Sequence, residues 1–238
     1  MPHNDTPRLG GGGMGEFRDE LNIRERRTFP DVSGDDRLYR RLTDIVAVMT
    51  ASGSSADETY HEALRGQRDD EEFVILVFKT LDALNESAYI ERWALVQLAI
   101  DLEHPVAGDY LAELVRRPIP EEQSEDPGHG LSTVTEEVIL RTTAIEGLAR
   151  LLRRDVDTTE ALLETIASSD YVAMRRAAWF AIADSGRDDA VQRARSILQE
   201  RGDGWIAELR RIPVEEAEQH DPKLIKPPRG STPAPYGE

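Results

Sequence analysis

Arginine is the residue type whose placement in this sequence most suggests a binding chemistry. Adjacent pairs of arginines recur along the chain, and Arg92, Arg141, Arg175 and Arg176 fall within apolar segments that have the period of an α-helix. A guanidinium group carries five N–H donors and can bind a carboxylate through two of them. One hypothesis is therefore that these four side chains form a basic ridge that meets an acidic surface of another protein.

A structural explanation competes with this hypothesis. The pairs Arg116-Arg117, Arg153-Arg154 and Arg210-Arg211 each close a predicted helix, where cations complement the helix dipole by about 0.3 to 1 kcal/mol each. Trp205 is open to two interpretations as well. It follows Gly202 and Gly204, so it either covers the end of the helical domain or stays exposed as an anchor for a partner.

The sequence predicts no catalytic residue, no cofactor and no metal. It has no cysteine, no two histidines three or four residues apart, and no Gly-x-Ser-x-Gly, phosphate-loop or dinucleotide-binding glycine motif. Adjacent carboxylates such as Glu136 and Glu137 are expected at the surface of so acidic a chain. We therefore expect a protein that is not an enzyme.

Charge narrows the choice of partner. The 238 residues include 46 acidic and 29 basic side chains, a formal net charge of -17 that repels nucleic acid and anionic lipid surfaces. No signal peptide and no run of 18 apolar residues is visible, and cysteine is absent, so we expect a cytoplasmic protein without a membrane segment. Arginine greatly outnumbers lysine, which hints at a bacterial source.

Composition divides the chain into three parts. Residues 1–34, with four consecutive glycines at 10–13, are typical of a flexible leader, and the mixed charges of 16–41 predict a loose stretch that becomes ordered only against a partner or the first helices. Residues 213–238 are polar and contain six prolines, which predicts a tail without helices. Residues 35–212 form the predicted helical domain. Within it, residues 119–133 form an acidic loop, either a solvated insertion or a binding element.

The helical domain shows one helical pattern after another. Apolar residues from Leu38 to Met49 follow the 3.6-residue period, and Ser55 with Glu58 and Thr133 with Glu136 suggest capping boxes at helix starts. Residues 73–78 alone could form a buried strand, but Leu81 and Leu84 restore the helical period and favour a helix. Further helices are predicted over 89–102, 105–117, 133–154, 158–167, 171–184, 188–199 and 205–211.

Three of these segments are repeats of one pattern. Ile90 to Ala94 is followed by Leu98-Ala99, Leu140 to Ala144 by Leu148-Ala149, and Met174 to Ala178 by Ile182-Ala183, at offsets of 50 and 34 residues. Each segment has an apolar first residue, a basic residue one or two positions later, alanine at the fifth position and a large apolar residue at the ninth. The pattern resembles the second helix of HEAT repeats, which are roughly 40 residues long.

This resemblance implies an all-α fold, a short right-handed α-solenoid of HEAT-like helix pairs, with an irregular helical bundle as the alternative. The function that it implies is a protein-binding scaffold or adaptor. The sequence predicts neither the identity of the partner nor the oligomeric state. A narrower version is a bacterial immunity or inhibitor protein that neutralises a basic toxin. A third alternative is a HEAT-like DNA glycosylase or lyase, against which the net charge argues.

Overall fold

A computed structural model describes residues 23, 26–127 and 132–209 of this chain. These residues form nine α-helices and one short 3₁₀-helix, and no β-strand appears among them. The all-α prediction is confirmed for this part of the chain. The elements are α1 (Asp36–Met49), α2 (Ala56–Arg65), α3 (Glu71–Asp82), α4 (Tyr89–Leu102), α5 (Ala107–Arg116), α6 (Thr133–Leu152), α7 (Thr159–Ser168), α8 (Val172–Ala183), α9 (Asp188–Glu200) and η1 (Gly204–Glu208).

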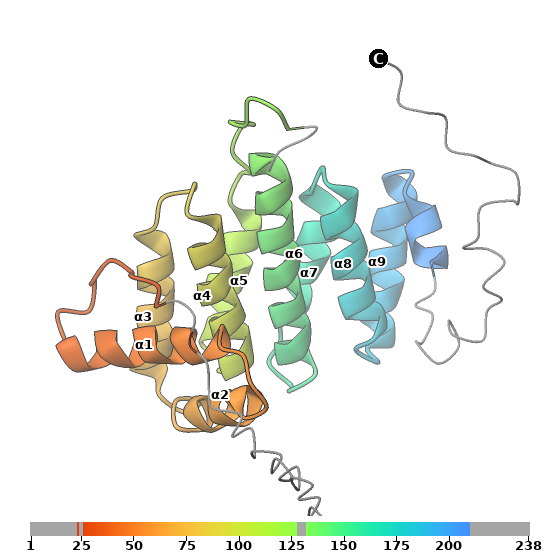
Figure 1. Cartoon of the computed structure of the whole chain (residues 1–238). Coiled ribbons are helices and arrows are strands. Elements are labelled where there is room, and N and C mark those ends of the chain that lie inside the picture. Colours follow the sequence, from red (N-terminus) through yellow and green to blue (C-terminus); the bar gives the residue numbers. More distant parts are fainter. Residues whose placement is uncertain (1–22, 24–25, 128–131, 210–238) are drawn as a thin grey trace, which may run out of the picture.

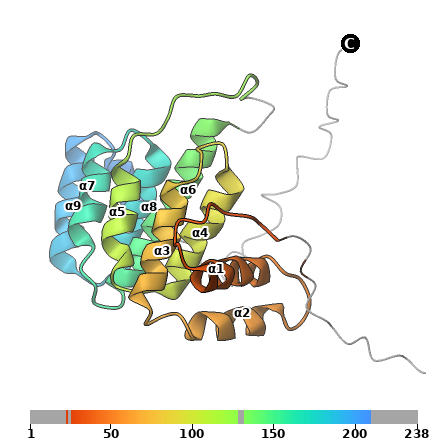
Figure 2. The same cartoon turned by 90° about the vertical axis from the view of Figure 1, so that its left-hand side faces the viewer.

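From α3 onward the helices form two layers in a row (Figures 1 and 2). Helices α4, α6 and α8 form one layer, which we call the inner layer, and α3, α5, α7 and α9 form the outer layer behind it. Each inner helix packs against the outer helix that precedes it in the chain, and α6 also packs against both α4 and α8. The inner helices are therefore covered on three sides, as their many apolar residues require.

Helices α1 and α2 occupy the N-terminal end of the row, where α1 runs across the ends of the layers (Figure 1) and contacts α3 and α4. Residues 26–34 of the predicted leader lie against these helices. The Phe29 side chain is buried, and the backbone carbonyl of Phe29 accepts a hydrogen bond from the Tyr39 hydroxyl at 3.0 Å. Arg27 pairs with Glu91 on α4. One buried aromatic ring and two ion pairs, Arg27 with Glu91 and Arg26 with Asp44 on α1, order this stretch against the first helices. Residues 1–22 and the predicted tail lie outside the described residues.

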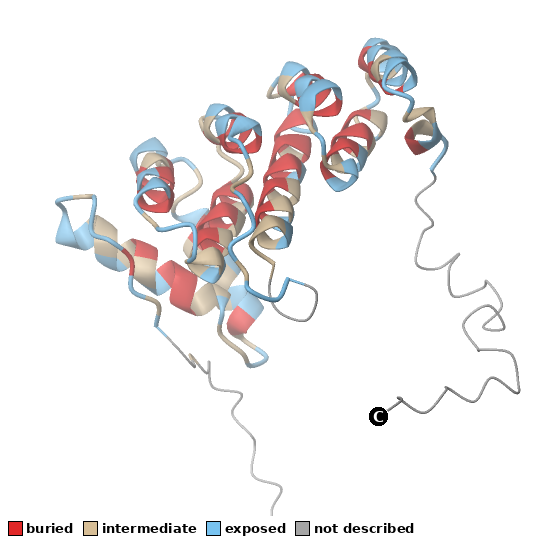
Figure 3. Ribbon diagram, turned by 90° about the horizontal axis from the view of Figure 1, so that it is seen from above, coloured by how far each residue is buried: buried red, intermediate tan, exposed pale blue. Residues whose placement is uncertain are grey.

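The repeat pattern corresponds to buried positions of the inner helices. The fifth residue of each repeat, Ala94, Ala144 or Ala178, is at most 1% exposed, and the ninth, a leucine or isoleucine, is fully buried in all three helices. Figure 3 shows that buried segments of the ribbon concentrate on the sides of the helices that face one another. Alanine has no side-chain atoms beyond Cβ, so neighbouring helices can approach closely there, and the larger ninth residue fills the space between them. The first position departs from the pattern, because Ile90 is exposed.

The 50-residue offset between the first two repeats has a structural cause. Helix α6 has 20 residues and begins at Thr133, seven residues before the first repeat position Leu140, whereas α8 begins two residues before Met174. The extra turns at the start of α6 and the connection after Arg116 supply the additional residues. The predicted acidic loop lies in this connection, and residues 128–131 of it are outside the described part of the chain.

Four predicted local features can be compared with the structure: two capping boxes, the helix over 205–211 and the helix over 73–78. Ser55 makes no side-chain capping bond, and the cap of α6 is Ser132 rather than Thr133, because the Ser132 side chain accepts from the Thr135 amide. Where a helix is predicted over 205–211, the described residues form the short η1 (Gly204–Glu208), and residues 210–211 lie outside the described part of the chain. Residues 73–78 do lie in a helix, since Asp70 accepts a hydrogen bond from the Phe73 amide and caps α3.

Candidate functional site

The predicted arginine ridge divides into buried and exposed side chains. Arg92, Arg141 and Arg175 are 8%, 3% and 6% exposed, whereas Arg176 is exposed to solvent. A buried guanidinium requires partners inside the protein. Those partners show what the repeated arginines do.

Arg92 and Arg141 share one buried carboxylate. Glu137, in the extra turns of α6, accepts a hydrogen bond from each of the two guanidinium groups, Arg92 on one carboxylate oxygen and Arg141 on the other. Burial lowers the pKa of Arg141, and the charge of Glu137 opposes that change. The cluster ties α4 to α6 and holds two positive charges against one negative charge.

The three buried arginines also bind backbone carbonyls next to their helices. Arg92 donates to the Glu86 carbonyl at 3.2 Å, and Arg175 donates to the Ser169 carbonyl at 2.7 Å, in each case six residues earlier in the chain. Arg141 donates to the carbonyls of Arg117 and Pro118, which follow α5. Each of the three thus fastens its inner helix to the connection that leads from the outer layer.

Arg175, like Arg92, forms an ion pair with a carboxylate from another part of the chain. Its Nε lies 2.9 Å from the Asp203 carboxylate, which comes from the segment between α9 and η1. The hypothesis of an exposed basic ridge is therefore wrong for Arg92, Arg141 and Arg175, because their guanidinium groups are buried inside the domain. Arg176 is the member of the predicted set that remains at the surface.

Trp205 is the exposed aromatic residue at the C-terminal end of the row. It is 50% exposed in η1, while the neighbouring Ile206 is buried and anchors η1 against the helices. Trp205 thus has features of both interpretations. It lies at the end of the row, as a covering residue would, and half of its surface is exposed, as an anchor for a partner would require. Trp179, in α8, is buried as expected of a core residue.

The inner layer carries three exposed aliphatic side chains. Ile90 on α4, Ile139 on α6 and Val172 on α8 are 52%, 44% and 42% exposed. They lie zero, one and two residues before the first repeat position of their helices, so they are at a similar height along the row but at different angles around their helix axes. We call these three residues the aliphatic stripe. Sequence reasoning missed it, because apolar residues in apolar helices are expected to be buried.

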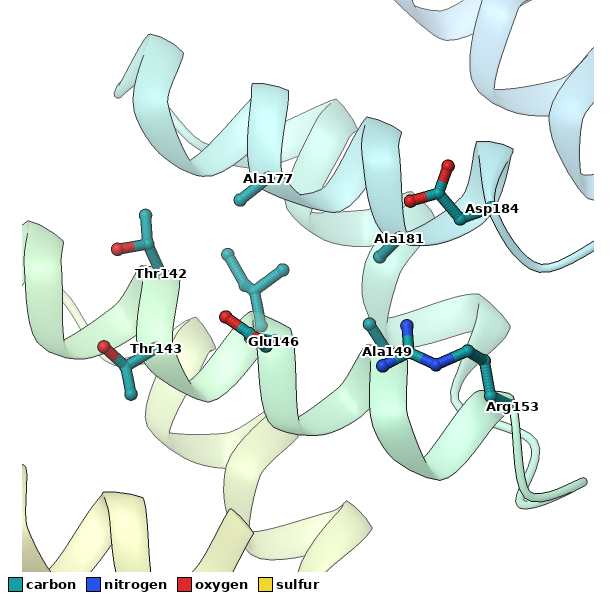
Figure 4. A pocket seen from close by; sticks show the side chains of 9 residues that line it. Thr142, Thr143, Glu146, Ala149, Arg153, Ala177, Ala181 and Asp184 are labelled. Atoms are coloured by element: carbon teal, nitrogen blue, oxygen red, sulfur yellow. The ribbon is translucent and has the colours of Figure 1, made fainter. Parts of the chain in front are cut away.

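A groove of about 500 Å³ lies between α6 and α8 (Figure 4). Small residues form much of its surface, namely Ala149 on α6 and Ala177 and Ala181 on α8. Figure 4 shows the side chains of Arg153 and Asp184 at one end of the groove and Thr142 and Thr143 at the other. Alanines that let α6 and α8 approach closely thus also leave a hollow on the surface.

The acidic loop is fastened to the start of α6 through Glu122. The Glu122 carboxylate accepts hydrogen bonds from the Ser132 hydroxyl and from the amides of Thr133 and Ser124, the last two at 2.9 Å. These bonds lower the pKa of Glu122 to about 2. The bonds favour the ionised form, so they stabilise the loop above pH 4.5, the ordinary pKa, and are lost as the pH falls toward about 2.

We expect an NMR titration of the Glu122 side-chain carboxyl carbon to give a midpoint near 2. The variant Glu122→Ala should accelerate hydrogen exchange of the Thr133 amide about tenfold near neutral pH, because that amide loses its acceptor. Glu121→Ala, one residue earlier in the same loop, serves as the control and should leave the exchange rate unchanged. A midpoint above 4, or equal exchange in both variants, would contradict this role of Glu122.

No group of three or more histidine, aspartate or glutamate side chains in the described part of the chain could hold a metal ion, and none of its helices is long and apolar enough to cross a bilayer. Comparison with known proteins adds no assignment: no family model, no curated protein and no solved structure matches this chain.

Proposed function

We propose that this chain is a non-enzymatic protein-binding scaffold or adaptor, built as a short right-handed α-solenoid of HEAT-like helix pairs. The observation that carries the proposal is the aliphatic stripe of Ile90, Ile139 and Val172 on three successive inner helices. The buried repeat positions and the two-layered row support the solenoid architecture.

Single exposed aliphatic residues are normal on protein surfaces, but one such residue on each of three neighbouring helices favours an interaction surface. Each residue of the stripe comes from a different helix, and the rigid layer behind them fixes their spacing. The groove between α6 and α8 adds a hollow that a large side chain of a partner could enter. Pockets filled by such anchors contribute a large share of binding energy in protein interfaces.

The charge of the chain indicates the chemistry of the partner. With a formal net charge of -17, the molecule attracts proteins with basic surfaces and accelerates their association at low salt. We therefore propose a partner with an apolar centre and a basic rim. The inhibitor of a basic toxin is a narrower form of this function, in which the partner is one cytotoxic protein.

Replacing two residues of the stripe tests the proposal. We expect the full chain to capture a stoichiometric protein from its native cell, and the double variant Ile139→Asp/Val172→Asp to bind that protein at least about tenfold more weakly, because the aspartates must be desolvated in the interface. Binding is measured with the purified pair.

Val32→Asp is the matched control, since Val32 is also an exposed aliphatic residue but lies before α1. It should bind like the unaltered chain. Equal binding by the stripe variant and the control would refute the stripe as the interface. A circular dichroism spectrum of each variant confirms that the helices are intact.

A further inference from the structure

A second groove, separate from the proposed protein-binding surface, lies where three connections between helices come together. It has a volume of about 580 Å³ and is lined by residues at or just after the C-terminal ends of α2, α4 and α6. Its arginines are Arg65, Arg68 and Arg154, and its carboxylates are Asp69 and Glu103. The lining thus has a local excess of positive charge in a chain that is strongly acidic overall.

Arg68 is the unusual member of this lining. Its Nε atom is shielded from solvent and has no hydrogen-bond partner, and no ion pair of its guanidinium occurs within the described ranges. A buried donor without an acceptor is rare in proteins and often marks a place for a bound ion or water. The other such atom, Nε of Arg175, lies 2.9 Å from the Asp203 carboxylate and is compensated by that charge.

The positions of Arg65 and Arg154 are explained by helix dipoles, which favour a cation at the C-terminal end of a helix, but the position of Arg68 is not. Arg65 is the last residue of α2, and Arg154 follows α6 and pairs with Glu103 at 3.1 Å, so both lie where a cation stabilises a helix end. Arg68 lies beyond α2, in the turn that leads to α3, and donates to no backbone carbonyl among the residues that the structure describes.

The backbone of the groove is also unusual. Only two non-glycine residues in the described ranges have a positive φ, Glu103 at 52° and Asp155 at 63°. Glu103 lines the groove, and Asp155 lies between two lining residues, Arg154 and Val156. Left-handed backbone at non-glycine residues costs energy and concentrates at functional sites.

We propose that this groove binds a phosphate-type oxyanion between Arg68 and Arg65. A phosphate group is doubly charged near neutral pH and offers several acceptor oxygens, which match the planar fork of donors of two guanidinium groups better than a single carboxylate does. At physiological salt the screening length is about 8 Å, so the net negative charge of distant surfaces does not prevent binding in a locally basic groove.

The test is an NMR titration of the arginine Nε–Hε signals of the full chain at constant ionic strength, with inorganic phosphate, methyl phosphate and acetate in separate arms. Saturable binding of phosphate, at least about tenfold tighter than binding of acetate, is expected. Binding of methyl phosphate as well would indicate a phosphate ester as the ligand. Binding of inorganic phosphate alone would indicate the free ion. Both results support the site.

Arg68→Gln should weaken phosphate binding at least about tenfold, because it removes a charge-assisted donor. Arg65→Gln is a second variant that should also weaken binding, in case the first one fails to fold. Arg176→Gln removes an exposed arginine from α8, outside the groove, and should bind phosphate like the unaltered chain. Acetate binding as tight as phosphate binding, no saturation up to about 20 mM, or equal losses in all three variants would overturn the proposal.

Discussion

Replacing Glu137 with glutamine is expected to lower the free energy of unfolding by about 3 to 5 kcal/mol. The Glu137 carboxylate is 2% exposed and is the acceptor for both Arg92 and Arg141, which are themselves buried. Glutamine keeps the size of the side chain but removes the negative charge, so two buried guanidinium groups remain without a counterion. Urea unfolding followed by circular dichroism measures the change.

Glu136→Gln is the matched control for this variant. Glu136 precedes Glu137 on α6 and is only partly buried, so its replacement should change the free energy of unfolding by less than about 0.5 kcal/mol. A loss below about 1 kcal/mol in Glu137→Gln would show that the arginines find other partners, and that the cluster does not hold α4 and α6 together.

Replacing Gly147 with alanine is expected to lower the free energy of unfolding by about 1 to 3 kcal/mol. Gly147 lies in the middle of α6, and a Cβ atom there would come within 2.7 Å of Ile100 Cγ1 on α4 and 2.8 Å of Leu111 Cδ1 on α5. Alanine favours helices over glycine by up to about 1 kcal/mol, but this gain is smaller than the expected cost of separating three packed helices. The same unfolding measurement reports the outcome.

Gly66→Ala makes the same chemical change with the opposite expectation. A Cβ atom at Gly66 meets nothing closer than 3.8 Å, and the backbone φ of -73° suits alanine. This variant should be neutral or more stable by up to about 1 kcal/mol, since alanine restricts the unfolded chain. If Gly147→Ala were also neutral, the packing of α6 against α4 and α5 would be looser than the structure shows.

The repeated arginines illustrate how one sequence pattern can support two interpretations. A basic residue near the first repeat position recurs in all three inner helices, and Arg92, Arg141 and Arg175 each bind a backbone carbonyl before their helix. Each also pairs with a buried or partly buried carboxylate, which follows Arg92 and Arg175 in the chain but precedes Arg141 by four residues. Glu137 lies four residues before Arg141 on α6, a spacing that the sequence shows, but no local pattern connects Glu137 to Arg92 or Asp203 to Arg175. The recurrence was therefore visible in the sequence, and the inward direction of the side chains was not.

The 3.6-residue periodicity of apolar residues was most informative about which side chains of a helix are buried. The alanines at the fifth repeat position and the large residues at the ninth are buried in every inner helix, as their spacing predicts. Helix ends were less predictable, because Ser132 caps α6 in place of Thr133 and Ser55 makes no capping bond. Several polar residues near each helix start compete for that role, and the tertiary position of the connection selects among them.

The sequence by itself determined the helical class of the described domain and the residues that form its core, because local period and side-chain size decide which faces must leave water. Only the tertiary structure decided which charged side chains are buried and which apolar residues of the aliphatic stripe remain exposed. It also decided that α4 and α5 pack so closely against α6 that only glycine fits at position 147. Those outcomes depend on contacts between residues far apart in the chain, such as Arg92 with Glu137, and the energy of a buried charge is set by the partner that the fold brings to it.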